Sequence, residues 1–144
     1  MGAPAPHGGD RSGRNRGRVN LVVDSSFVID HLLGDAGAIA RWDRVFSDGE
    51  RPFVTEIVVC EVRAGLREAD ERHLLAFLRP IEFVQPGPDA ALQAGRWRYA
   101  AHRRGRHLSL ADGLIAAAAE SLDAAVLTRN VRDFALTPAR VETY

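Results

Sequence analysis

The chain has 144 residues, of which 46% are apolar and 26% charged, and its formal net charge is zero. This length and composition predict one soluble folded domain with a single core. All nineteen basic residues are Arg, and the absence of Lys excludes a phosphate-binding P-loop, kinase-type chemistry and Schiff-base chemistry. No apolar stretch is long enough to cross a bilayer, so we expect no membrane association.

Residues 1–18 differ in composition from the rest of the chain. They are rich in Arg, Gly and Pro, without apolar periodicity or the apolar segment of a signal peptide. We interpret them as a disordered tail, whose basic charge would add non-specific attraction to phosphates. The alternative is a mis-assigned start, because a Val codon at Val19 can initiate bacterial translation. The folded domain is expected to cover residues 19–144.

From residue 19 onward, short β-branched runs alternate with stretches of helical periodicity. This alternation is typical of an α/β domain with a mostly parallel central sheet flanked by helices. Strands are expected at 19–24, 52–54, 81–84, 125–128 and, at the edge of the sheet, 141–144. Helices are expected at 25–33, 35–46, 55–65, 70–78, 88–104 and 109–122.

The single cysteine, Cys60, lies among apolar neighbours in the third of these helices. The pattern predicts a buried and unreactive thiol. A lone cysteine forms no internal disulfide, which fits a reducing compartment, and we therefore expect the protein to be cytoplasmic.

Four acidic residues lie beside or within apolar segments. Asp24 ends the first strand, Glu61 interrupts an apolar helix, Asp112 opens another, and Asp133 follows the strand at 125–128. Acids are rarely buried unless they are paired or bind a cation. Because ligands of parallel sheets bind beyond the carboxyl ends of the strands, we expect these carboxylates to converge there around a divalent metal ion.

Two of the acids also have a structural interpretation as helix caps. Asp24 directly precedes a helix, where an Asp side chain is a favoured N-cap. Asp112 stands three residues after Ser109, which is the spacing of a capping box. Either role would explain the residue without a metal.

The other two acids differ in how easily they are explained. Asp133 has basic neighbours, Arg129 and Arg132, with which it can pair. Glu61 has the apolar neighbours Ile57 to Val62, which argue against an exposed position. Glu61 is therefore the hardest of the four to assign to a purely structural role.

Four segments carry a resemblance to a known family: Val22 to Ser26 with Asp30, Glu61–Val62, Leu110 to Ala117, and Leu127 to Phe134. Together they resemble the PIN-domain ribonucleases, and among these the VapC toxins of bacterial toxin–antitoxin pairs. The resemblance covers residues 19–144. It implies a compact PIN-like α/β domain that hydrolyses RNA phosphodiester bonds with Mg²⁺, which Mn²⁺ can replace. It also implies a homodimer and a cognate VapB-type antitoxin that silences the enzyme.

The same resemblance implies roles for single residues. Asp24 and Asp112 would be direct metal ligands, and Glu61 would hold a water of the metal or a second ion. Ser26 resembles the family's polar residue near the first acid. No nucleophilic side chain is required, because a water activated by the metal attacks the phosphodiester.

The fourth acidic position remains open between two residues. Many members of the family place an acid within the segment that here contains Asn130, which would then act as a neutral ligand or hold a water. Asp133 is either the fourth acid itself or a structural neighbour. An acid suits a metal better, whereas the spacing from Thr128 favours Asn130.

A basic segment supplies candidates for RNA contact. Arg103, Arg104 and Arg106 follow Trp97 and Tyr99 closely in the chain. Basic residues beside aromatic ones suit phosphate contact and base stacking. An amphipathic helix with a solvated Arg face and a buried Trp97 explains the pattern equally well.

Two other functions remain open. A PIN domain can lose catalysis and persist as an RNA-binding or interaction module, although the presence of Asp24, Glu61 and Asp112 argues against this. The second is a phosphohydrolase on a similar sheet. Haloacid dehalogenase-like phosphatases need an Asp where this chain has Ser26, and receiver domains need a Lys that it lacks.

Overall fold

The computed structural model of the chain describes residue 2 and residues 19–144. Five strands form one sheet in the order β3-β2-β1-β4-β5, and each neighbouring pair is parallel. The strands are β1 (Asn20–Val23), β2 (Arg51–Thr55), β3 (Glu82–Val84), β4 (Ala124–Leu127) and β5 (Arg140–Glu142). The expected α/β fold with a parallel sheet is confirmed. The tail predicted at 1–18, apart from residue 2, lies outside the described residues.

The helices follow the expected alternation, with one addition. They are α2 (Ser25–Leu32), α3 (Ala36–Ser47), α4 (Glu56–Ala64), α5 (Glu71–Leu78), α6 (Gly87–Arg103), α7 (Leu110–Ser121) and α8 (Val131–Phe134), with a 3-10 turn η1 (Glu68–Asp70) before α5. The additional helix is α8, a single turn where only a loop was expected. No helix within residues 19–144 combines the length and apolarity needed to span a bilayer.

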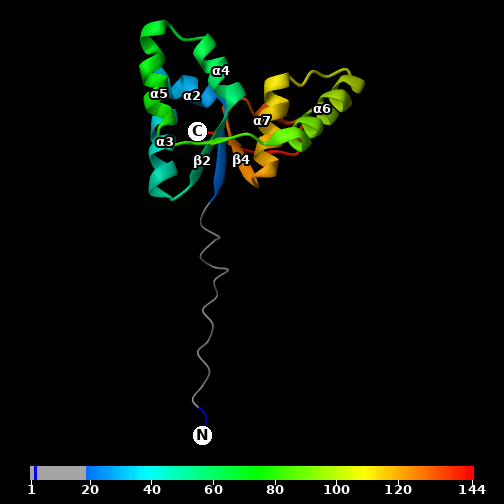
Figure 1. The fold of residues 1–144 in the computed structure, drawn as a ribbon, viewed down its shortest axis with the longest axis horizontal. Helices are drawn as coiled ribbons and strands as arrows, with labels where there is room; N and C mark the ends of the chain where they lie inside the picture. The colour runs from blue at the N-terminus through cyan, green and yellow to red at the C-terminus, as the bar shows by residue number, and fades with distance from the viewer. Residues whose placement is uncertain (1, 3–18) are drawn as a thin grey trace.

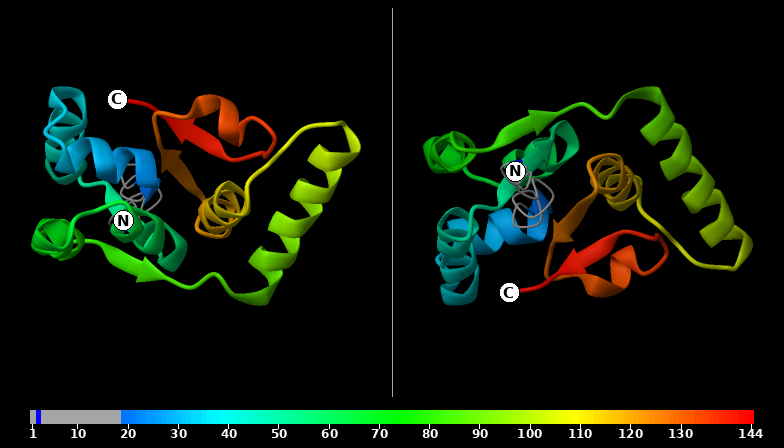
Figure 2. Two further views of the ribbon diagram at one scale, coloured as in Figure 1. Left: turned by 90° about the horizontal axis from the view of Figure 1, so that it is seen from above. Right: turned by 90° about the horizontal axis from the view of Figure 1, so that it is seen from below.

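The helices cover both faces of the sheet. Figures 1 and 2 show α2, α3 and α5 on one side, and α6 and α7 on the other. The central strands β1 and β4 are buried along almost their whole length, as expected for a parallel sheet covered on both faces. The carboxyl ends of β1, β2 and β4 therefore share one edge of the sheet, and the turns into α2, α4 and α8 leave from this edge.

Helix α7 is held close to α6 by a buried glycine. A Cβ on Gly113 would lie 3.4 Å from Cγ of Arg98 and 3.5 Å from Cβ of Ala94, both on α6. Arg98 also donates from Nε to the carbonyl of Leu108, at 3.0 Å, in the segment that leads into α7. The first turn of α7, which carries Asp112, is fixed by this packing.

The expectation that Cys60 is buried is wrong, because the residue is exposed. The apolar run in α4 contains residues on both faces of the helix. Val58 and Val62, four positions apart, are each only 1% exposed and face the core, whereas Cys60 lies on the outer face. A run of apolar residues in a short surface helix therefore does not identify a buried face by itself.

Candidate active site

Asp24 lies at the carboxyl end of β1, where the chain turns into α2. Its backbone N–H donates to the carbonyl of Leu127 at 3.0 Å, which places it directly beside the end of β4. The residue is only 2% exposed. Although Asp24 occupies the N-cap position of α2, its side chain makes no capping hydrogen bond. The capping interpretation of Asp24 is therefore wrong.

Two hydroxyl groups hold one oxygen of the Asp24 carboxylate, Oδ2, and a longer bond of 3.5 Å runs from Oγ of Ser25 to the other oxygen. Ser26 donates from Oγ to Oδ2 of Asp24 at 3.0 Å, and Thr128 donates from Oγ1 to the same oxygen at 2.7 Å. The two hydroxyl oxygens lie 3.1 Å apart, and Thr128 is fully buried. The hydrogen bonds from Ser26 and Thr128 fix the direction of the carboxylate.

The same two hydroxyls anchor the turn that follows β4. The backbone N–H of Arg129 donates to Oγ of Ser26 at 3.2 Å, and that of Asn130 donates to Oγ1 of Thr128 at 2.9 Å. Each hydroxyl thus donates to Asp24 and accepts a backbone amide. Thr128 is a site residue that was missed from the sequence, where a neutral hydroxyl at the end of a strand gave little indication of its role.

Asp112 lies in the first turn of α7 and is half-buried. Its backbone N–H donates to Oγ of Ser109 at 3.0 Å, so the capping position expected for Ser109 is confirmed. Partial burial raises the pKa of the Asp112 carboxyl. A hydrogen bond with Ser109 opposes this rise in the pKa, and the charges of Asp24 and Asp133 add to it. Ser109 thus caps the helix through the backbone of Asp112, and the Asp112 carboxylate lies close enough to Asp24 and Asp133 for their charges to affect its pKa.

Glu61 is exposed on α4, contrary to the burial expected from its apolar neighbours. It shares the outer face of the helix with Cys60, while Val58 and Val62 occupy the inner face. Its pKa is nevertheless raised, first by loss of hydration and then by the charges of Asp24 and Asp112. A hydrogen bond with Ser25 offsets part of this rise. Glu61 therefore borders the same acidic region from its solvent side.

The two candidates for the fourth position lie on the same turn. Asp133 is exposed in α8, and its charge contributes to the raised pKa of Asp112. Asn130 is exposed and directly precedes α8. Among residues 19–144, Asp133 forms an ion pair with neither Arg132 nor Arg129, whose guanidinium binds Asp30.

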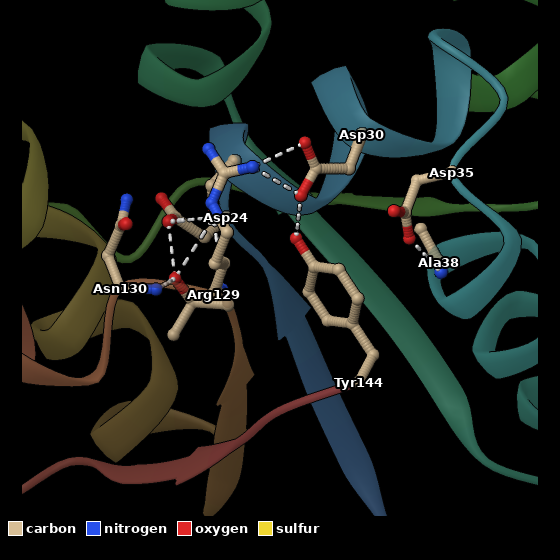
Figure 3. Close-up of polar contacts among 9 residues, drawn as sticks. Asp24, Asp30, Asp35, Ala38, Arg129, Asn130 and Tyr144 are labelled. Carbon is tan, nitrogen blue, oxygen red and sulfur yellow. Dashed lines mark hydrogen bonds and ion pairs between the residues drawn. The ribbon is translucent and has the colours of Figure 1, made fainter.

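A second polar cluster, missed from the sequence, adjoins Asp24. Arg129 donates from Nη1 to both carboxylate oxygens of Asp30, at 2.6 and 2.8 Å. The hydroxyl of Tyr144 donates to Oδ2 of Asp30 at 2.6 Å. Figure 3 shows Arg129 and Tyr144 converging on the Asp30 carboxylate from separate parts of the chain. In the sequence, Asp30 belongs to a segment that carries the family resemblance, but the pattern predicts no role for it.

The basic candidates for substrate contact lie at the end of α6 and in the segment before α7. Arg103 ends α6, and Arg104 and Arg106 lie in the segment that leads to α7; all three are exposed. Within residues 19–144, no ion pair joins them to the acidic region. Trp97 is half-buried and packs against the core, as the amphipathic-helix interpretation expects.

The acids fit a divalent cation that is held by few protein ligands. In the described part of the chain, Asp24, Glu61, Asp112 and Asp133 belong to no ion pair. The same residues form no group of three or more His, Cys, Asp or Glu side chains arranged to hold a metal ion. A closed protein cage is thus not present among them. Mg²⁺, however, is commonly bound by one or two carboxylates, with water and substrate phosphate completing its shell.

Comparison with known proteins identifies the class of protein. The model of the PIN domain family matches residues 21–139, and the chain belongs to this family. Among curated proteins, Ribonuclease VapC19 of Mycobacterium tuberculosis is 34% identical over 119 residues, covering 81% of this chain and 94% of its own. The family resemblance read from the sequence is thereby confirmed.

Two solved structures show the same fold. VapBC2 of Rickettsia felis, bound to a promoter DNA fragment, has a chain that superposes with a TM-score of 0.77 at 17% identity, covering 88% of this chain and 99% of its own. DNA-bound VapBC of Salmonella typhimurium gives a TM-score of 0.73 at 24% identity, with 87% and 98% covered. At these identities the likeness concerns the fold.

Proposed function

We propose that this protein is a Mg²⁺-dependent endoribonuclease and the toxin of a VapBC-type toxin–antitoxin module. The observation that carries the proposal is the group of acids at the carboxyl edge of the sheet, which lack cationic partners among the described residues. Burial raises the pKa of Glu61 and Asp112, and the charges of neighbouring acids add to the rise. Mutual repulsion of this kind is relieved by a bound cation. The likeness to Ribonuclease VapC19 supports RNA as the substrate.

The residues divide the work between binding the ion and orienting the reactants. Asp24 and Asp112 would hold Mg²⁺, or Mn²⁺ in its place, and the ion supplies Lewis acidity to water and to the scissile phosphate. The hydroxyls of Ser26 and Thr128 fix the direction of the Asp24 carboxylate. Glu61, at the solvent side of the site, would hold a water of the metal or a second ion.

The test is RNA cleavage by the purified protein with Mg²⁺ or Mn²⁺, with and without EDTA. We expect cleavage of structured RNA that EDTA stops, no hydrolysis of a generic phosphomonoester, and no cleavage by Asp112→Asn. Glu120→Gln, which removes an exposed acid from the last turn of the same helix, is the matched control and should cut normally. Cleavage that persists in EDTA or in Asp112→Asn would refute the mechanism.

The second candidate is a PIN-fold RNA-binding or interaction module without catalysis. It is favoured by the absence, among residues 19–144, of a closed group of three metal-ligating side chains. A chain that binds RNA but leaves it intact in both Mg²⁺ and Mn²⁺ would have this function.

The antitoxin is proposed to cover an apolar groove beside α2 and α4. The groove has a volume of about 380 Å³ and is lined by Ile29, Leu32, Leu33, Val62 and Leu66, among others. Leu33, which is 79% exposed, adjoins the other apolar side chains of this groove, and a contiguous exposed apolar surface is typical of a protein–protein contact. The VapBC complexes with similar folds support a VapB-type partner. Co-purification with the product of an adjacent small reading frame would test this.

A homodimer is proposed on similar grounds. Helix α3 exposes Ile39 and Phe46, which are 39% and 47% accessible. We expect α3 and α4 to contribute to the dimer interface, the antitoxin interface or both. Light scattering of the isolated protein should give the mass of two chains, and a monomer at all concentrations would count against the dimer.

A further inference from the structure

The guanidinium of Arg129 is only partly used by its ion pair. Arg129 directs Nη1 alone at Asp30, and this single nitrogen reaches both carboxylate oxygens. Within residues 19–144, neither Nε nor Nη2 of Arg129 makes a hydrogen bond. These two nitrogens form one edge of the planar guanidinium, with parallel N–H groups that match two oxygens of a phosphate. The unused edge is therefore suited to binding a phosphate.

The two partners in this ion pair differ strongly in exposure. The Arg129 side chain is 60% exposed, whereas that of Asp30 is 11% exposed. Asp30 is a fixed anchor, because it also accepts the Tyr144 hydroxyl at 2.6 Å. Burial and the neighbouring Asp30 raise the pKa of Tyr144, so its hydroxyl remains protonated and continues to donate. A buried anchor that holds an exposed cation reduces the entropy lost when the cation binds a ligand.

The location of Arg129 is the third observation. Its backbone N–H donates to the same Ser26 hydroxyl that orients Asp24. Asp24 and Asp30 are six residues apart at the start and end of α2, which corresponds to about 9 Å along the helix axis. A cation anchored on Asp30 thus lies beside the acids without pairing with them. The acidic region would repel RNA, and a fixed cation at its border offsets that repulsion.

We propose that Arg129 binds an RNA phosphate next to the scissile one, and that Asp30 and Tyr144 act as positioning residues for its guanidinium. The inference rests on the proposed RNA substrate, and it assigns substrate contact to a residue outside the Arg103 to Arg106 segment. The competing explanation is that Arg129 only neutralises the buried Asp30.

Paired substitutions separate the two explanations. Arg129→Ala alone would leave a buried carboxylate without its cation and would destabilise the fold. We therefore compare Asp30→Asn, which keeps the cation, with Asp30→Asn/Arg129→Gln, which removes it and leaves no buried charge. The matched control is Asp123→Asn against Asp123→Asn/Arg140→Gln. Arg140 pairs with Asp123 at the opposite edge of the sheet, and its side chain is 62% exposed.

The assay measures binding, so that it does not depend on cleavage. All variants carry Asp112→Asn, and a fluorescent single-stranded RNA of random sequence, about 20 nucleotides long, is titrated in KCl without divalent ions. Removing the Arg129 cation should weaken binding about tenfold at low salt, the loss of one charge-assisted pair. Between about 50 and about 200 mM KCl the ratio of the two dissociation constants should shrink about 2.6-fold. One phosphate contact to a single strand changes the slope of log K against log salt concentration by about 0.7. Removing Arg140 should change neither quantity.

Arg129→Lys, in the Asp112→Asn background, is the second variant. Lys keeps the positive charge beside Asp30 but lacks the pair of N–H groups that Nε and Nη2 of Arg129 offer to a phosphate. The variant should therefore keep the salt dependence of RNA binding and lose affinity at low salt. Equal affinity and slope in Asp30→Asn and Asp30→Asn/Arg129→Gln would overturn the proposal, even if the parent protein cleaves RNA. Failure of the parent to bind the oligonucleotide would also overturn it, and the separate cleavage assay would then decide the proposed function.

Discussion

Thr128 offers the sharpest test of how the site is held together. Its hydroxyl donates to the nearly buried Asp24 carboxylate at 2.7 Å and accepts the N–H of Asn130 at 2.9 Å. Thr128→Val keeps the shape of the side chain and removes both bonds. Losing a hydrogen bond to a charged group costs about 1.5–3 kcal/mol, and a neutral one about 1 kcal/mol. We therefore expect a loss of about 3 kcal/mol in the free energy of unfolding, or roughly 10 °C in Tm.

The assay is urea unfolding of the metal-free protein, with Thr137→Val as the control. Thr137 also makes two hydrogen bonds through its hydroxyl, to Phe134 and from Ala139, but both partners are neutral backbone groups. The control should lose only about 2 kcal/mol, about 1 kcal/mol for each neutral bond. If Thr128→Val costs no more than Thr137→Val, the charge-assisted bond to Asp24 is not a major support of the site, and the reasoning fails.

Two further predictions concern the acids. Folding raises the pKa of Asp112 and Glu61. At pH values above the ordinary carboxyl pKa, the folded state therefore binds more protons than the unfolded chain. These two carboxyls should therefore contribute less stability to the metal-free protein as pH rises from about 4 toward neutrality. Over this range Asp112→Asn should lose less stability in urea unfolding than the parent does, and an unchanged dependence would contradict this. At the fourth position, Asp133→Asn should raise the Mg²⁺ concentration needed for cleavage more than Asn130→Ala does, and an unchanged requirement in Asp133→Asn would favour Asn130.

The strands and the acids next to them were predictable because their signals are local. The residues Leu21, Val22 and Val23 form a continuous apolar run, and their complete burial follows from a central position in a parallel sheet. Asp24 comes directly after this run, so its placement at the carboxyl edge follows from the strand. The cap at Ser109 was likewise visible as a local pattern.

The remaining features depend on contacts between distant residues or on very short elements. Asp30 is 99 positions from Arg129 and 114 from Tyr144, and no pattern in one sequence links them. Helix α8 has only four residues, fewer than are needed to show a helical period. Glu61 was expected to be buried because its neighbours are apolar, but an amphipathic helix of this length buries only part of such a run.

The central claim is that carboxylates at this edge cleave RNA through a divalent ion, and the most direct measurement is the RNA cleavage rate as a function of free Mg²⁺. It should be made on the parent protein and on Asp24→Asn side by side, after removal of bound metal. The parent should show no cleavage without metal and a saturable rise as Mg²⁺ is added, whereas Asp24→Asn should remain inactive throughout. Cleavage by the metal-free parent, or an unchanged Mg²⁺ dependence in Asp24→Asn, would contradict the claim.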